Sequence, residues 1–359
     1  MKKYLNLSII LLLIITLTAA GSDNRKPKNL IIFIGDGMGV AQVYAGMTAS
    51  GFTMTFPAFP VTGFSITYSA NSYITDSAAG GTAISAGEKT NNGMLAMRPD
   101  STLLQTIMEM AKSAGLSAGV ISTSAVTHAT PASFIAHDAS RGSYEDIARW
   151  FLKGTADVFI GGGANYFRSR KDSADLTADL QKLGYDVVYN LPDLKKSSSP
   201  RIAGLMAEGD MPYIDTGRDP EFLAAATAKA IEVLSRNKNG FVLMVEGSQI
   251  DWADHDNNLK RSIEETLDMD RAAKVAYDYA RKNGNTLIVV TADHETGGLT
   301  LTGGDVEEKT VTGSFSTNGH TGVMVPVFAY GPGAAAFTGV QQNTELFNDF
   351  IRLLSLNNK

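Results

Sequence analysis

The segment 246–255 concentrates side chains that could bind a metal ion. It reads Glu-Gly-Ser-Gln-Ile-Asp-Trp-Ala-Asp-His. If its second half is helical, Asp251 and His255 lie four residues apart on one helix face and can bind the same cation. An aspartate with a histidine is typical of zinc sites. An ion pair or a helix cap between the same two residues is the alternative interpretation.

Four more ligand-type side chains stand directly after predicted strands or inside glycine-rich turns: Asp36, Asp293, His294 and His320. The chain has only five histidines, so three of them in such surroundings argue against scattered surface positions. Together with Asp251 and His255, the set supplies six nitrogen and oxygen ligands. That number is enough for two zinc ions that keep open positions, as catalytic zinc does.

Ser77 precedes a run of small residues, 78–83, at a predicted helix start. One interpretation is a helix N-cap. The same position also suits phosphate chemistry, because free backbone amides and the helix dipole attract a phosphate and small side chains let it approach. A serine hydroxyl alone is a poor nucleophile. Since no His or Lys lies close to Ser77 in the sequence, a metal is the expected activator.

Predicted strands alternate with predicted helices along the chain. The strands are Leu30–Ile34, Ala118–Ser122, Ala156–Ile160, Asp186–Tyr189, Phe241–Val245, Thr286–Thr291 and Val325–Tyr330. The helices are Val40–Met47, Ser77–Gly87, Leu103–Ala114, Tyr144–Leu152, Pro220–Arg236, Lys260–Lys282 and Thr344–Leu354. This alternation, with several continuous apolar strands, predicts an α/β fold in which a mostly parallel central sheet lies between helices.

The ends of four predicted strands carry polar side chains that suit metal binding: Asp36, His128, Thr130, Glu246, Asp293 and His294. In an open α/β sheet, reactive groups gather at the carboxyl ends of the strands. We therefore expect these side chains to meet at one edge of the sheet.

Composition limits the classes of function. The 359 residues include 31 Lys and Arg against 37 Asp and Glu, a net charge of −6, which argues against nucleic-acid binding by bulk charge. The chain has no Cys and is 44% apolar, so we expect a packed core without disulfides. Because no repeat or linker interrupts the sequence, residues 21–359 are predicted to form one domain.

The first twenty residues read as a secretory signal peptide. Met1-Lys2-Lys3 precedes a short apolar run, 5–17, and small residues follow up to Ala20, where cleavage is expected. The run is too short for a membrane span, and no later segment is apolar enough to span. The mature protein is thus expected in the periplasm or outside the cell.

Six motifs occur in the order found in the alkaline phosphatases, a family that the chain resembles from about Lys28 to its C-terminus. They are Gly-Asp-Gly-Met-Gly at 35–39, Asp-Ser-Ala-Ala at 76–79, Ala-Thr-Pro-Ala at 129–132, Glu-Gly-Ser-Gln-Ile-Asp-x-x-x-His at 246–255, Thr-Ala-Asp-His at 291–294 and His-Thr-Gly at 320–322. The resemblance implies hydrolysis of phosphate monoesters to alcohol and inorganic phosphate through a phosphoserine. It also implies the family's fold, with a short crown-type insertion.

The resemblance further implies a role for each site residue. Ser77 is the expected nucleophile, and Arg141, eleven residues after Thr130, matches the arginine that clamps the phosphate. The first zinc would bind Asp251, His255 and His320, and the second would bind Asp36, Asp293 and His294. A third metal, usually magnesium, would be shared by Asp36, Thr130 and Glu246. The pair His128 and Trp252, expected to support that third site without binding it, resembles cold-adapted members and leaves the metal's identity open.

Two competing functions remain at this point. A phosphodiesterase of the same superfamily would share both zinc sites, but it would not need Arg141, Thr130 and Glu246 together. An exported metal- or phosphate-binding protein without turnover would have no use for a serine between the metals. Only 25 residues separate His294 from His320, fewer than in the crown of larger members, so a homodimer is left open.

Overall fold

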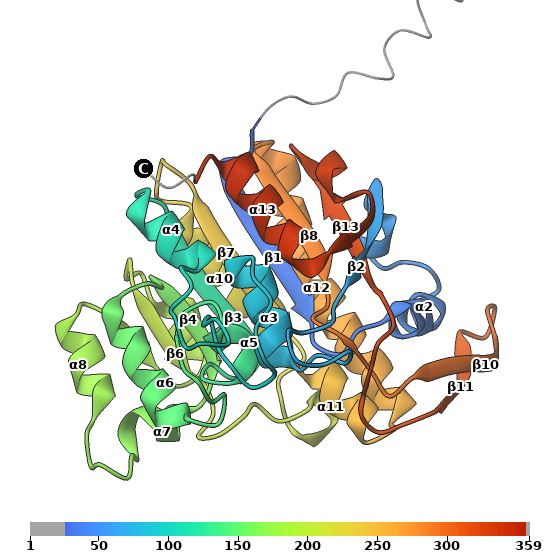
Figure 1. Ribbon diagram of the computed structural model, residues 1–359, viewed down its shortest axis with the longest axis horizontal. Helices are drawn as coiled ribbons and strands as arrows, with labels where there is room; N and C mark the ends of the chain where they lie inside the picture. Colours follow the sequence, from blue (N-terminus) through green and yellow to red (C-terminus); the bar gives the residue numbers. More distant parts are fainter. Residues whose placement is uncertain (1–25, 357–359) are drawn as a thin grey trace, which may run out of the picture.

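A ten-stranded sheet forms the centre of the molecule in the computed structural model, which describes residues 26–356 (Figure 1). Its strand order is β14-β2-β13-β8-β1-β7-β3-β4-β6-β5. The strands are β1 (Asn29–Gly35), β2 (Val61–Ile66), β3 (Ser117–Ala125), β4 (Val158–Gly162), β5 (Asp186–Val188), β6 (Ile202–Leu205), β7 (Phe241–Gly247), β8 (Thr286–Thr291), β13 (Val325–Tyr330) and β14 (Gly339–Gln342). All neighbours are parallel except β13, which runs antiparallel to β8 and β2. The predicted mostly parallel α/β sheet is confirmed.

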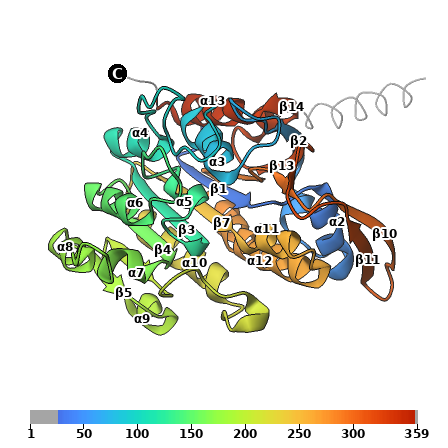
Figure 2. The ribbon, with the colours of Figure 1, turned by 60° about the horizontal axis from the view of Figure 1, so that its bottom comes forward.

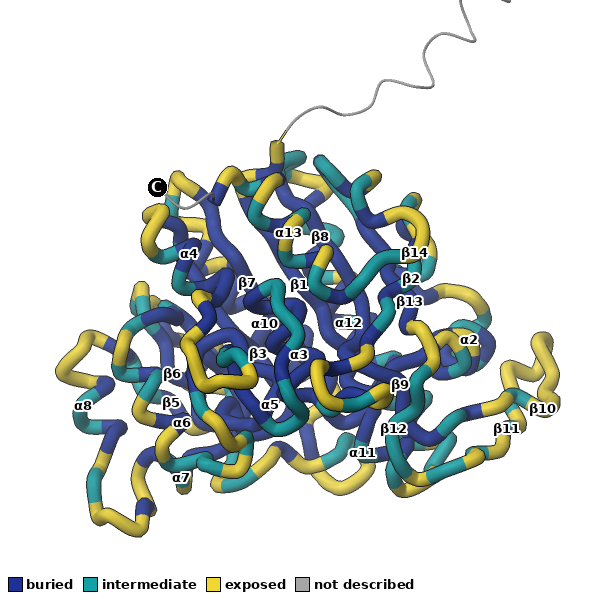
Figure 3. The backbone as a smooth tube through the Cα atoms, viewed as in Figure 1, coloured by how far each residue is buried: buried dark blue, intermediate teal, exposed yellow. Residues whose placement is uncertain are grey.

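Helices cover both faces of this sheet. They are α2 (Val40–Ala49), α3 (Ser77–Ala86), α4 (Ile107–Ser113), α5 (Ala129–Ala132), α6 (Tyr144–Trp150), α7 (Ala164–Arg168), α8 (Leu176–Lys182), α9 (Leu191–Lys196), α10 (Phe222–Leu234), α11 (Gln249–His255), α12 (Leu259–Asn283) and α13 (Asn343–Leu354). Alternate side chains of β1 enter two separate cores. One core includes α3, α4, α6 and α13, and the other includes α2, α10, α11 and α12. The central strands are therefore buried on both sides, as Figure 3 shows.

The predicted elements agree with the observed ones, with shifts at their ends. The helix expected over Leu103–Ala114 begins only at Ile107, because Thr106 caps it: the Thr106 hydroxyl accepts from the backbone amide of Glu109, whose carboxylate accepts from the amide of Thr106. The strands β2, β6 and β14 were not predicted. They are short, and β2 and β14 are partly exposed, so neither carries a continuous apolar run.

Two small two-stranded sheets lie in the segment that follows His294 and includes His320. β10 (Leu299–Asp305) and β11 (Thr310–Phe315) form a hairpin that projects beside α2 (Figure 2), in the place of the expected crown-type insertion. β9 (Glu295–Thr296) pairs antiparallel with β12 (His320–Thr321). Within residues 26–356, no helix combines the length and apolarity needed to cross a membrane. The predicted signal peptide, residues 1–20, lies outside the described part of the chain.

Candidate active site

Four adjacent strands at the middle of the sheet carry the ligand-type residues to one edge. Asp36 directly follows β1, Glu246 is the penultimate residue of β7, and Asp293 and His294 follow β8. Beyond β3 the chain enters the short helix α5, which carries Thr130. Since β8, β1, β7 and β3 are neighbours and run parallel, these side chains meet at their carboxyl ends. The convergence expected from the sequence is present in the structure.

Asp36, Asp293 and His294 form a cluster with no solvent exposure. The His294 Nε2 atom lies 3.4 Å from Asp36 Oδ1 and 3.3 Å from Asp293 Oδ2. The His294 ring stacks on the His320 ring at a centroid distance of 3.5 Å. The resemblance links this cluster to the second zinc. Through the contact between His294 and His320, it touches the cluster around Asp251 that is described next.

Asp251 stands between two histidines. Helix α11 places Asp251 and His255 one turn apart, with 3.2 Å between Asp251 Oδ2 and His255 Nε2, and His320 Nε2 lies 3.6 Å from Asp251 Oδ1. Each histidine turns its Nδ1 to a backbone carbonyl: His255 to Asn318 at 2.6 Å and His320 to Thr75 at 2.9 Å. An Nδ1–H that donates to a carbonyl leaves the Nε2 lone pair free for a ligand.

A third group shares Asp36 with the first cluster. Ring or carboxylate atoms of Asp36, His128 and Glu246 lie within 4.8 Å of one another, and the Thr130 hydroxyl donates to Asp36 Oδ2 at 3.4 Å. The Trp252 ring packs edge-on against His128 at 5.5 Å. Trp252 therefore contacts His128, and its supporting role stays a prediction, whereas His128 comes near enough to the carboxylates to bind a cation itself.

These clusters contain buried polar atoms that no donor within residues 26–356 satisfies. Four of these atoms have no hydrogen-bond partner in that part of the chain: Asp36 Oδ1, Asp293 Oδ2, Glu246 Oε1 and His128 Nδ1. A buried polar atom without a partner costs about 1–3 kcal/mol, and more when it is charged. Several such atoms within 4.8 Å of one another fit a divalent cation, which binds carboxylate oxygen and imidazole nitrogen lone pairs together. The donor set thus fits divalent metals.

The pKa values of the carboxyl groups in these clusters also favour a bound cation. Burial, followed by the charge of Asp293, raises the pKa of Asp36 well above its usual value. Burial also raises the pKa of Glu246 to about 7 and that of Asp293 to about 6. Burial acts in the same direction on Asp251, but the three histidines around it outweigh burial and hold its pKa below the usual range. The charged forms of Asp36, Glu246 and Asp293 are therefore disfavoured by burial, and a nearby cation would favour them.

Ser77 is the first residue of α3, and its neighbour Asp76 is the N-cap. The Asp76 carboxylate accepts from the amide of Ala79 at 3.0 Å, so the cap role considered for Ser77 belongs to Asp76. The Ser77 hydroxyl is free to face the clusters and lies 3.3 Å from His294 Nε2. A Cβ on Gly80 would lie 3.0 Å from the Asp293 carbonyl oxygen, so glycine lets this helix approach the end of β8 closely.

Arg141, in the loop between α5 and α6, points toward the same helix terminus. Its Nη1 donates to Asp76 Oδ2 at 2.9 Å, and its Nη2 lies 3.4 Å from His128 Nε2. Asp76 Oδ2 also accepts from the Gly93 amide at 3.0 Å. Asp76 therefore fixes both the start of α3 and the guanidinium, a role that sequence analysis missed. The available signal was an acidic residue directly before Ser77.

Two further residues were missed because their partners are distant in the sequence. The Ser122 hydroxyl, within β3, donates to Glu246 Oε2 at 2.5 Å and leaves only Oε1 free. The Thr296 hydroxyl contacts both Asp251 and His294. No pattern in the sequence marks either residue.

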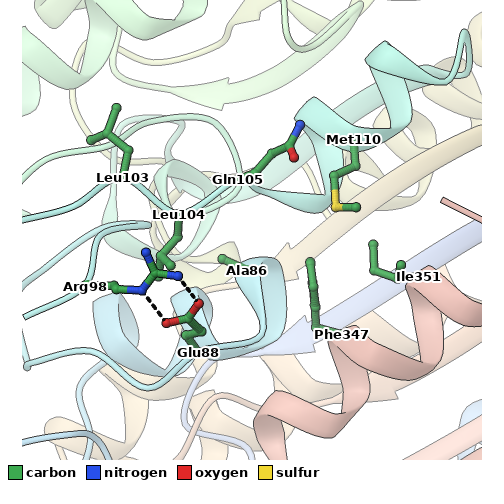
Figure 4. A pocket seen from close by; sticks show the side chains of 9 residues that line it. All are labelled: Ala86, Glu88, Arg98, Leu103, Leu104, Gln105, Met110, Phe347 and Ile351. Atoms are coloured by element: carbon green, nitrogen blue, oxygen red, sulfur yellow. Dashed lines mark hydrogen bonds and ion pairs between the residues drawn. The ribbon is translucent and has the colours of Figure 1, made fainter. Parts of the chain in front are cut away.

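A separate pocket of about 420 Å³ lies between the end of α3, α4 and α13 (Figure 4). A bidentate ion pair between Arg98 and Glu88 closes one side, and Phe347 and Ile351 of α13 form another. None of the ligand-type residues described above lines it.

Comparison with known proteins decides the family. A sequence model described as alkaline phosphatase matches residues 27–315. The chain belongs to the alkaline phosphatase family. It is 34% identical to alkaline phosphatase 3 of Bacillus subtilis, with 92% of this chain and 90% of that protein aligned, and 34% identical to the Escherichia coli alkaline phosphatase, with 92% and 87% aligned.

Solved alkaline phosphatases share the fold. The enzyme from the Antarctic bacterium TAB5 superposes with a TM-score of 0.89 at 40% identity, covering 93% of this chain and 100% of that one. A histidine-to-aspartate variant of that enzyme, with Mg bound in its M3 site, gives a TM-score of 0.87 at 38% identity, covering 93% and 99%. The chain is thus a phosphatase with the family's α/β architecture, and family membership supports phosphomonoester hydrolysis.

Proposed function

We propose that this alkaline phosphatase hydrolyses phosphate monoesters through a phosphoserine on Ser77, at a site that holds two zinc ions and one magnesium ion. One observation carries the proposal: the hydroxyl of Ser77, at a helix N-terminus, contacts His294 Nε2, and that same nitrogen lies 3.3–3.4 Å from buried oxygens of Asp36 and Asp293 that have no hydrogen-bond partner within residues 26–356. Such a hydroxyl needs activation, and a bound cation can supply it.

The residues divide into three ligand sets. Asp251, His255 and His320 would hold the first zinc, and Asp36, Asp293 and His294 the second. Glu246 and Thr130 would hold magnesium together with Asp36, with His128 close enough to join them. When bound, the divalent ions lower the pKa of oxygen nucleophiles and offset negative charge on the phosphoryl group.

The reaction consists of two displacements at phosphorus. Ser77 Oγ attacks phosphorus and loses its proton, while the bond from phosphorus to the ester oxygen breaks and that oxygen leaves as an alcohol after protonation. A water molecule then attacks the phosphoserine from the vacated side. The bond from Oγ to phosphorus breaks, Oγ regains a proton, and inorganic phosphate leaves.

Arg141 and α3 stabilise the transferred group. The planar guanidinium can donate two parallel hydrogen bonds to non-bridging phosphoryl oxygens, and its link to Asp76 holds it at the helix terminus. Backbone amides and the dipole of the ten-residue helix α3 add positive potential at the same place. Phosphomonoesters of many alcohols should react, because these contacts are all with the phosphoryl group.

The competing phosphodiesterase activity is less well supported. A monoester dianion presents three non-bridging oxygens, whereas a diester carries a second alkyl group in place of one of them. The Arg141 guanidinium would donate hydrogen bonds to those oxygens, and a cation held by the third ligand set, around Asp36, would offset their negative charge. We therefore expect turnover of a monoester to exceed that of the matching diester by a wide margin.

The same proposal includes export. The pattern of residues 1–20 predicts a signal peptide cleaved after Ala20, which would place the enzyme in the periplasm or outside the cell. Cell fractionation with a serum against the mature chain tests this. Retention of residues 1–20 on a cytoplasmic protein would contradict it.

The phosphoserine is tested by trapping with a ³²P-labelled monoester and acid quenching. Wild type should retain label and Ser77→Ala should retain none. The matched control is Ser85→Ala in the same helix, because the Ser85 hydroxyl bonds the Ser133 carbonyl and faces away from the clusters. Labelling of Ser77→Ala at the wild-type stoichiometry would refute the assignment.

A further inference from the structure

Thr296, the second residue of β9, contacts three of the six residues expected to bind zinc. It is fully buried. Its hydroxyl hydrogen-bonds to Asp251 Oδ1 and lies 3.2 Å from His294 Nδ1. Its backbone pairs with His320 across the two-residue ladder between β9 and β12. Asp251 and His320 belong to the first ligand set, and His294 belongs to the second.

The hydrogen positions follow from the chemistry of these groups. A carboxylate oxygen only accepts hydrogen bonds, so the Thr296 hydroxyl must donate its single hydrogen to Asp251. The oxygen of Thr296 then has only lone pairs left for His294, and the contact requires a hydrogen on His294 Nδ1. The lone pair of that neutral ring is therefore on Nε2, the atom that faces Asp36, Asp293 and Ser77.

We propose that Thr296 is a positioning residue that couples the two zinc ligand sets through one hydroxyl, orienting Asp251 and fixing the Nε2 lone pair of His294. The inference rests on the proposed function. Partners of this kind raise the affinity of a ligand set without touching the metal, because they fix tautomer and ring orientation before binding.

The surroundings of Thr296 keep its hydroxyl in place. Its amide donates to the Gly37 carbonyl at 3.0 Å, and its carbonyl accepts from Gln42 Nε2 at 3.0 Å. Gly37 has φ +76°, and a Cβ there would lie 2.9 Å from Thr296 Oγ1 and 2.8 Å from Asp251 Cα. The turn after β1 therefore presses directly against this hydroxyl and against α11.

Isosteric variants separate the hydroxyl from the shape of the side chain. Thr296→Val keeps the branched shape and removes the hydroxyl, and Thr296→Ser keeps the hydroxyl. The matched control is Thr266→Val in α12, which removes a buried hydroxyl bonded to the Ser262 carbonyl at 2.8 Å and away from the ligands. Thermal unfolding of each metal-free variant establishes that it folds.

Zinc affinity is the main measurement, made by competition between metal-free protein and a chromogenic chelator. Thr296→Val should weaken both zinc sites by about 10- to 100-fold, while Thr296→Ser and Thr266→Val stay within about threefold. Unchanged affinity at both sites in a folded Thr296→Val protein would overturn the proposal. Weakening at the first site alone would overturn the coupling.

Histidine ¹⁵N NMR of the metal-free wild type gives a second test that needs no variant. His294, assigned by comparison with His294→Gln, should show a protonated Nδ1 and an unprotonated Nε2. The opposite tautomer would overturn the proposal even if Thr296→Val failed to fold. A wild type that binds no zinc and cleaves no monoester would instead refute the proposed function, so the two failures are distinguishable.

Discussion

Replacing Arg141 by alanine is expected to lower kcat/KM for a phosphate monoester by about two orders of magnitude. The guanidinium can form two charge-assisted hydrogen bonds to phosphoryl oxygens, each contributing about 1.5–3 kcal/mol. Its side chain is 28% exposed, so the lower value is appropriate and the pair contributes about 3 kcal/mol. At about 1.4 kcal/mol for each factor of ten, this is about 100-fold in kcat/KM.

Arg141→Lys separates the contribution of the positive charge from that of the planar guanidinium. Lysine keeps the charge but cannot form the planar two-pronged contact, so about half of the stabilisation is lost and kcat/KM falls about tenfold. Asp76 should keep the start of α3 in place in both variants, because the amides of Ala79 and Gly93 still donate to it. Inhibition by inorganic phosphate should weaken in parallel, since the product offers the same oxygens.

The assay is steady-state turnover of an aryl phosphate in excess zinc and magnesium. The matched control is Arg98→Ala, which breaks the bidentate pair with Glu88 at the pocket of Figure 4, a pocket that none of the ligand sets lines. It should change kcat/KM by less than about twofold, because an exposed ion pair contributes little. If Arg141→Ala lowers kcat/KM no more than Arg98→Ala does, the phosphate clamp is wrong.

Two further predictions concern stability. His137 turns Nδ1 to the Ala96 carbonyl at 2.8 Å and Nε2 to Glu109 at 3.0 Å; burial lowers its pKa, but these bonds outweigh burial and raise it. The stabilisation from protonated His137 is full below the unfolded pKa of about 6.5 and is lost as the pH rises through the higher folded pKa. His137→Gln should therefore lower the free energy of unfolding by about 1 kcal/mol, and by more at about pH 6 than at about pH 9. Urea titrations measure this, and an equal loss at both pH values would contradict it. Gly331→Ala would place a Cβ 2.1 Å from the Thr286 carbonyl oxygen, whereas Gly184→Ala has no atom within 4 Å and meets only the strain of a positive φ. Calorimetry should show that Gly331→Ala lowers the free energy of unfolding by about 3 kcal/mol or more and Gly184→Ala by about 1 kcal/mol. Equal losses in the two variants would refute the clash.

The sequence predicted those parts of the fold that depend on local pattern. The strands β1, β7 and β8 are continuous apolar runs bounded by glycine or polar residues, and a sheet covered on both faces requires such runs. The antiparallel direction of β13 has no such local signal, because it depends on how the chain returns to β8 and β2. The short strands β9 and β12, which carry Thr296 and His320, are separated by 23 residues in the chain and likewise depend on tertiary contacts for their pairing.

The candidate site was predictable at its ligands but not at the residues that hold them. Asp36 and His294 stand at strand ends, where chemistry is expected from topology. Asp76, Ser122 and Thr296 act through partners that lie 65, 124 and 45 residues away in the chain. Hydroxyl and carboxylate groups of this kind are common in loops and caps, so only the folded structure distinguishes them.

The central claim is that six side chains bind two zinc ions beside the Ser77 hydroxyl. Elemental analysis of the purified protein, joined to monoester turnover before and after chelation, tests it most directly. We expect two zinc ions per chain, loss of turnover when they are removed, and recovery when zinc and magnesium are restored. A metal-stripped protein that cleaves the monoester at the original rate would contradict it.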